Sequence, residues 1–148
     1  MIMSETRSPR ETFHALLGGI TAGRFTEIVD LYAEDTVVET VFDHGGPGRF
    51  EGRKVLAERF AQVAEHFPLE LSHENVVVRA TDDPEVIVAE WDYRVRHRAT
   101  GRTRTTANIQ VLRVRDGLIV HSRDFHDHVA LAALTGTLPQ LVEALEAA

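Results

Sequence analysis

An Asp116-Gly117 pair lies between two runs of alternating apolar residues, and this is the strongest structural signal in the chain. A two-residue type I′ turn needs positive φ angles at both central positions, which Asp-Gly adopts readily. The pattern therefore predicts a β-hairpin whose second strand covers residues 118–127. Because that strand ends in ionisable residues, we expect the chemistry of the protein at this end of a sheet, among Asp124, His126, Asp127 and His128.

Composition limits the classes of protein that the chain can represent. A length of 148 residues fits a single domain over 1–148, and a formal charge of −7 argues against a nucleic-acid partner. The absence of cysteine excludes disulfides and a thiolate nucleophile. The N-terminus has no apolar signal-peptide core, and no run approaches the roughly 18 apolar residues of a membrane span. We expect a cytoplasmic protein with no membrane partner.

Hydrophobic periodicity predicts two short helices at the start of the chain and a third over 52–67, which stops before Pro68. A β-branched strand over 36–43 and a loop over 44–48 separate the second helix from the third. The apolar positions of the first two helices are Phe13, Leu16, Leu17, Ile20, Phe25, Ile28, Val29 and Tyr32.

Long alternating segments then follow over 69–80, 85–98 and 102–115, before the strand over 118–127. An antiparallel meander is the natural assembly of these strands. The tail from Val129 is expected to be helical, with interruptions at Gly136 and Pro139. Helices early and strands late indicate an α+β fold, in which a curved antiparallel sheet is wrapped around helices and encloses a pocket.

This order of elements resembles the nuclear transport factor 2-like superfamily, as do the segments Leu31-Tyr-Ala-Glu-Asp35 and Arg115-Asp-Gly-Leu-Ile-Val120. Small members of the superfamily include ketosteroid isomerases, SnoaL-like polyketide cyclases and phenazine-biosynthesis isomerase-like proteins. The closest local similarity is to the phenazine group, through His66-Phe-Pro68, Thr81-Asp-Asp-Pro84 and Arg123-Asp-Phe125. The resemblance implies a cone-shaped barrel with an internal pocket, and a homodimer.

The resemblance also implies site residues. SnoaL-like cyclases use an aspartate near the end of the last strand as the general acid/base, and Asp127 matches that position; the acid of the phenazine group matches Asp124. The general base of ketosteroid isomerases is replaced by Thr40, and their oxyanion-hole acid by Gln110, so steroid isomerisation is not expected. A helical histidine of the phenazine group is replaced by Arg59.

Strand alternation separates the two aspartates. Asp127 shares one face of the strand with Phe125, whereas Asp124 shares the other face with Ser122 and His126, so without a bulge only one aspartate can point inward. We favour Asp127 as the residue that moves the proton, with Asp124 as the alternative. In the competing interpretation, the aspartates form ion pairs or cap the helix that starts near Val129.

On the strand predicted over 102–115, one face carries mostly uncharged residues and is expected to face the pocket. This face would place two amide donors, Gln110 and Asn108, near a reacting carbonyl. The other residues predicted to bind substrate are Trp91, Tyr93, Thr40, Arg59, His14, Phe125 and Asn108. The histidines at 121, 126 and 128 could form a metal site, but such residues are more often solvated or hydrogen-bonded, so we predict no metal. For the arginines between 94 and 104, a solvated sheet face or dimer surface is favoured over an anion site.

These features and the resemblance lead to one functional hypothesis and two rivals. The favoured function is a cofactor-independent acid/base enzyme, a cyclase or isomerase that acts on a hydrophobic polyketide-like or aromatic carbonyl compound in secondary metabolism. The first rival is an enzyme that opens an epoxide on the same fold, which needs a second carboxylate or a polar group directed at a water. The second rival is a small-molecule binding or accessory domain without catalysis.

Overall fold

The hairpin predicted from Asp116-Gly117 joins β5 (Thr103–Arg115) to β6 (Leu118–Phe125) in the computed structural model, which describes residues 6–148. Asp116 and Gly117 have φ angles of 52° and 76°, so both central positions lie in the left-handed region, as a type I′ turn requires. The second strand is two residues shorter than predicted, because the chain leaves the sheet after Phe125 and begins a helix.

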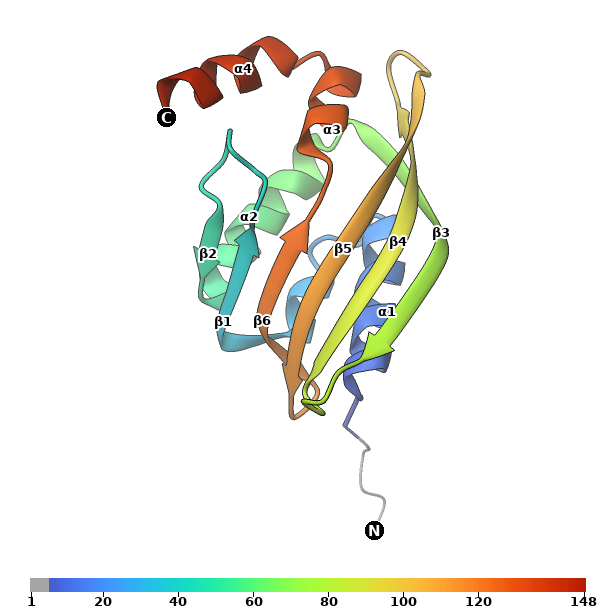
Figure 1. The fold of residues 1–148 in the computed structure, drawn as a ribbon, viewed down its shortest axis with the longest axis vertical. Helices are drawn as coiled ribbons and strands as arrows, with labels where there is room; N and C mark the ends of the chain where they lie inside the picture. Colours follow the sequence, from blue (N-terminus) through green and yellow to red (C-terminus); the bar gives the residue numbers. More distant parts are fainter. Residues whose placement is uncertain (1–5) are drawn as a thin grey trace.

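Six strands form one sheet in the order β2-β1-β6-β5-β4-β3. The other strands are β1 (Tyr32–Thr40), β2 (Arg49–Glu51), β3 (Leu69–Ala80) and β4 (Val86–His97). Strands β3 to β6 form the predicted antiparallel meander, but β1 is parallel to β6. Because a long stretch of chain connects β1 to β6, no short turn forces these two strands to run in opposite directions. The sheet is therefore mixed, and it is curved and open rather than closed into a barrel (Figure 1).

Two long helices, α1 (Pro9–Thr21) and α2 (Arg53–His66), lie behind the sheet in Figure 1. The second predicted helix is only a 3₁₀ turn, η1 (Ile28–Leu31), because Tyr32 already belongs to β1. The tail forms two helices, α3 (His128–Thr135) and α4 (Leu138–Ala147), and Gly136 ends α3 with a φ of 76°. Within residues 6–148, no helix is long and apolar enough to cross a membrane.

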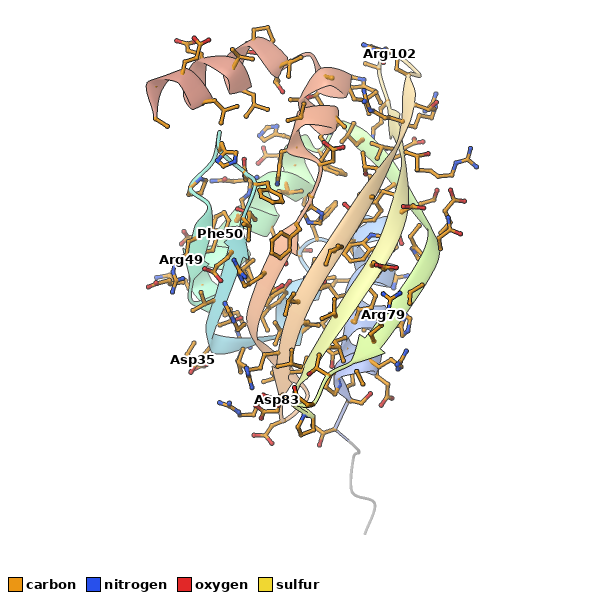
Figure 2. The ribbon with its side chains drawn as sticks, in the orientation of Figure 1. Asp35, Arg49, Phe50, Arg79, Asp83 and Arg102 are labelled. Carbon is orange, nitrogen blue, oxygen red and sulfur yellow. The ribbon has the colours of Figure 1, made fainter. Side chains whose placement is uncertain are left out.

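The core lies between α1 and the concave face of the sheet. Helix α1 begins with a capping box formed by Ser8 and Glu11, and it buries Phe13 against Trp91 of β4 with 5.2 Å between ring centroids. The predicted inward row of β4 is confirmed, since alternate residues from Ile87 to Val95 are buried. Figure 2 shows that Asp83 and Arg102 lie at opposite ends of the sheet, in the two turns that flank β4.

The α+β class and the curved sheet that packs against helices are thus confirmed. One irregularity in the sheet decides which side chains of β6 point inward. Val114 pairs with Ile119, but Arg113 pairs with His121, so Val120 is an extra residue in β6. A one-residue shift in a strand moves all later side chains to the opposite face. Ile119 therefore points inward before the shift, whereas Ser122 and Asp124 point inward after it.

The turn between β5 and β6 provides a first testable prediction. Replacing Gly117 by Ala should destabilise the protein by about 1–2 kcal/mol, because a side chain at positive φ meets its own backbone. The added Cβ would also lie 2.6 Å from Cγ2 of Thr6. Urea unfolding measures the change, with Asp116→Asn as the control, since Asn tolerates the left-handed conformation of residue 116. Equal stability of the Gly117→Ala variant and the wild type would contradict the assigned turn.

Candidate active site

A cavity of about 270 Å³ lies between the concave face of the sheet and the helices behind it. Its wall is mostly apolar and includes side chains from α1, α2, β3 and α3: Leu16, Ile20, Phe60, Val63, Leu69 and Leu131. Several polar lining residues, among them Thr40, Asp124 and His126, lie at or just beyond the ends of β1 and β6 that are nearest α3. The predicted pocket is therefore present, and it has a cluster of polar groups where β1 and β6 end.

Asp124 is the carboxylate fixed most firmly in the cavity wall. Its backbone lies between those of Thr40 on β1 and Gln110 on β5. Its Oδ1 accepts hydrogen bonds from Nε2 of Gln110, at 2.9 Å, and from Oγ of Ser122. Both donor residues are buried. Within residues 6–148, Oδ2 of Asp124 has no hydrogen-bond partner, so one carboxylate oxygen is held while the other stays available to a ligand.

His126 lines the same cavity two residues further along the chain. Its Nδ1 lies 2.8 Å from Oδ1 of Asn108, a buried residue of β5. Burial lowers the pKa of His126 below its ordinary value of 6.5, and the negative charge of Asp124 acts in the opposite direction. The cavity therefore favours the neutral imidazole.

Aromatic and hydroxyl groups complete this end of the cavity. The Trp91 ring packs edge-on against Tyr93 and His126, with centroid distances of 5.6 and 6.3 Å. Burial raises the pKa values of Tyr93 and Tyr32, so both hydroxyls remain protonated at neutral pH. Thr40 also lines the cavity, and its Oγ1 is buried with no hydrogen-bond partner in the described part of the chain.

Charged residues also line the cavity, namely Arg59 of α2 and Asp43, which follows β1. His128 lies beside them with its Nδ1 4.0 Å from Oδ1 of Asp43, and burial lowers the pKa of His128. The sequence reasoning assigned no role to Asp43, because this residue closes a predicted strand and precedes a glycine-rich loop. Its position at the end of a strand was the only available signal.

Three predicted site residues lie outside this cavity. Asp127 is exposed and caps α3, where its Oδ1 accepts a hydrogen bond from N of Ala130 at 2.9 Å. Side chains alternate along β6, so Phe125 points to the outer face of the sheet when Asp124 points inward. Its ring packs against that of Phe42, with 5.6 Å between the ring centroids. His14 is exposed on α1 and does not line the cavity. The competing interpretation of Asp127 as a helix cap therefore describes its position.

The two predicted amide donors are already engaged. Nε2 of Gln110 donates to Ser122 and Asp124, and Nδ2 of Asn108 donates to the carbonyl oxygens of Trp91 and Thr106, at 3.4 and 3.1 Å. An amide nitrogen has only two hydrogens. Neither residue therefore has a free donor for a substrate oxyanion, and both instead hold other side chains of the site in place.

The structure also shows the surroundings of the residues considered above for a metal site, among them His121, and for an anion site, the arginines between 94 and 104. His121 is on the outer face, where its Nε2 lies 2.8 Å from Oε2 of Glu39. Among residues 6–148, no three His, Asp or Glu side chains are arranged to hold a metal ion. Arg96 and Arg98 form ion pairs with Glu70 on the exposed side of the sheet. This placement agrees with the predicted solvated face.

Comparison with known proteins shows both a family and a shared fold. The sequence profile of the SnoaL-like domain matches residues 13–122. A Bacillus subtilis protein named as a candidate isomerase is 22% identical, with a TM-score of 0.79 over 87% of this chain and 93% of its own. A candidate polyketide cyclase from Xanthomonas campestris is 20% identical, with a TM-score of 0.68 over 85% of this chain and 95% of its own.

An LEH-like epoxide hydrolase from Mycobacterium tuberculosis is 18% identical, with a TM-score of 0.62 over 92% of both chains. The comparison with curated proteins gave no match. At these levels of identity the structural similarities show a shared nuclear transport factor 2-like fold, and they leave the reaction to be argued from the site.

Proposed function

Because the chain belongs to the SnoaL-like domain family, we propose that it is an acid/base enzyme, a cyclase or isomerase acting on a small hydrophobic carbonyl compound. The observation that supports this proposal most directly is the carboxylate of Asp124, which is held through one oxygen in the wall of a mostly apolar cavity. A pocket that only binds hydrophobic compounds has no need of such a group, whereas a carboxylate oxygen left free beside a bound ligand can exchange a proton with it.

The proposed reaction starts with Asp124 as the base. Its Oδ2 accepts a proton from a carbon next to the substrate carbonyl, the C–H electron pair becomes the enolate π bond, and the carbonyl oxygen takes the negative charge. In an isomerisation, the protonated carboxyl then returns the proton to another carbon. In a cyclisation, the enolate carbon attacks a second carbonyl, and the alkoxide that forms takes the proton back from the carboxyl of Asp124. Tyr32 and Tyr93 line the cavity with neutral hydroxyls that can donate to the oxyanion. No step in this sequence requires a cofactor.

The cavity also limits the substrate. A volume of about 270 Å³ is at or just below the lower end of ligand pockets, which span roughly 300–1,000 Å³. Aromatic and aliphatic side chains form most of the wall, so a compact, hydrophobic and planar compound is favoured. We propose an aromatic or polyketide-like carbonyl compound of secondary metabolism as the substrate, and a cytoplasmic homodimer of the 148-residue domain as the working form.

Epoxide opening is the second candidate, and a specific observation favours it. Asp43 lines the same cavity as Asp124, with Arg59 on the wall formed by α2. Two carboxyl groups permit one to take a proton from an attacking water while the other donates a proton to the epoxide oxygen. This arrangement supplies the second carboxylate that the epoxide hypothesis requires.

The proposal is tested with the wild-type protein and a panel of aromatic ketones and β-diketones in D₂O. We expect NMR to show protein-dependent deuterium incorporation at the carbon next to the carbonyl, because the enolate is reprotonated from exchanged Asp124. Hydrolysis of small aryl epoxides is followed in parallel. Binding without exchange or hydrolysis would contradict the enzymatic proposal and would favour the binding domain.

A further inference from the structure

The hydrogen bonds of Asn108 determine the tautomer of His126. Nδ2 of Asn108 lies within hydrogen-bond distance of two backbone carbonyl oxygens, those of Trp91 and Thr106. Carbonyl oxygens only accept, so the amide nitrogen must face them and Oδ1 must face His126. An oxygen acceptor 2.8 Å from Nδ1 requires a proton on Nδ1. In the neutral imidazole, Nε2 is therefore the unprotonated acceptor.

This acceptor belongs to a ring that lines the cavity. His126 is on the inward side with Asp124, and its Nε2 has no hydrogen-bond partner within residues 6–148. The charged groups that act on His126 are Asp124 of β6, Asp43 after β1 and His128 of α3. Arg59 of α2, Tyr93 of β4 and Tyr32 of β1 are the other ionisable residues of the cavity lining. The two carboxylates favour a proton on the ring, whereas burial and His128 oppose it.

We propose that Nε2 of His126 is a second catalytic group, which recognises and deprotonates a hydroxyl of the substrate. The substrate class is then a hydroxy-substituted carbonyl compound, such as a phenolic ketone or the enol of a β-diketone. This inference rests on the proposed function, because it adds a hydroxyl to the carbonyl compound on which Asp124 acts.

The step balances within the site. The substrate O–H bond breaks, its proton forms an N–H bond at Nε2, and the electron pair stays on the substrate oxygen. The charge on this oxygen is delocalised through the adjacent C=C bond of the enolate or phenolate, which makes the carbon next to the oxygen-bearing carbon nucleophilic. The resulting imidazolium keeps its Nδ1–H bond to Asn108, and the carboxylates of Asp124 and Asp43 compensate its charge. Returning the proton from Nε2 to the product oxygen restores the neutral ring.

The test compares binding of acetophenone with binding of its ortho-, meta- and para-hydroxy derivatives by NMR titration. The wild type is expected to bind at least one hydroxylated probe about tenfold more tightly than acetophenone, because the hydroxyl donates a hydrogen bond to Nε2 of His126. In His126→Asn, the amide nitrogen can still donate to Asn108, but the shorter side chain leaves no acceptor at the position of Nε2, so the preference should disappear. His121→Asn is the matched control on the outer face, and it should keep the preference.

Two further measurements use the wild type and so do not depend on the folding of a variant. Nitrogen NMR should show Nδ1 protonated and Nε2 unprotonated in the free protein at neutral pH. The hydroxyl preference should weaken as the pH falls through the lowered pKa of His126, because protonation removes the acceptor.

The inference about His126 is overturned by the opposite tautomer, by a wild type without the preference, or by a His126→Asn variant that retains it. These outcomes differ from failure of the proposed function, since deuterium exchange reports on Asp124 and hydroxyl selectivity reports on Nε2. A protein that selects hydroxylated probes without exchanging any carbon-bound proton would retain the binding role of His126. It would lose the acid/base role of Asp124.

Discussion

Replacing Asp124 by Asn should slow deuterium exchange by about 10²–10⁴-fold, the contribution typical of a positioned general acid or base. Asn has nearly the same shape, and its amide oxygen can still accept the hydrogen bonds that Gln110 and Ser122 donate to Oδ1. An amide cannot take a proton from carbon at neutral pH, so the variant removes the chemistry while the cavity wall stays intact. Exchange rates by NMR measure the loss, and titration with the same ketone should show retained binding.

Asp127→Asn is the matched control for this prediction. Asp127 accepts one hydrogen bond from N of Ala130 as the cap of α3, and Asn is as good a cap as Asp. We expect its exchange rate to equal that of the wild type. If Asp127→Asn slowed exchange and Asp124→Asn did not, the carboxylate that acts in catalysis would be the exposed one, and the cavity described above would not be the active site.

The sequence predicts that Asp127 points into the pocket, but the structure places Asp124 there instead, for a physical reason that lies in β6. The expected inward row of β5, which contains Asn108 and Gln110, is confirmed by their burial. With regular pairing from the Asp116-Gly117 turn, Gln110 would lie opposite Arg123, and the face shared with Asp127 would turn inward. The extra residue Val120 shifts the register, so Gln110 pairs with Asp124 instead.

A bulge of this kind has no sequence signal here, because Val120 is an ordinary strand residue within Leu-Ile-Val-His. Local patterns therefore predicted the strands and their alternation well, since these depend on neighbouring residues. Which face of β6 points inward depends on a one-residue shift in its pairing with β5. A similar limit applies to Asp43, which reaches the cavity through tertiary packing that the local pattern does not show.

Phe13→Ala is expected to lower the free energy of unfolding by about 3–5 kcal/mol, the range for truncation of a buried phenylalanine. Phe13 is fully buried, and its ring packs against Trp91, which forms part of the cavity wall. The substitution removes the contact between the Phe13 and Trp91 rings and leaves a void behind the site. A loss of this size is a large share of the roughly 5–15 kcal/mol that stabilises an ordinary domain.

Urea unfolding measures this loss, and His14→Ala is the control on the same helix. His14 is exposed, so its removal should change the free energy of unfolding by no more than about 0.5 kcal/mol. Comparable losses in the two variants would mean that α1 packs on the sheet through another face. That face would place His14 rather than Leu16 toward the cavity. A large loss for Phe13 alone supports the orientation in which α1 closes the back of the site and Leu16 lines it.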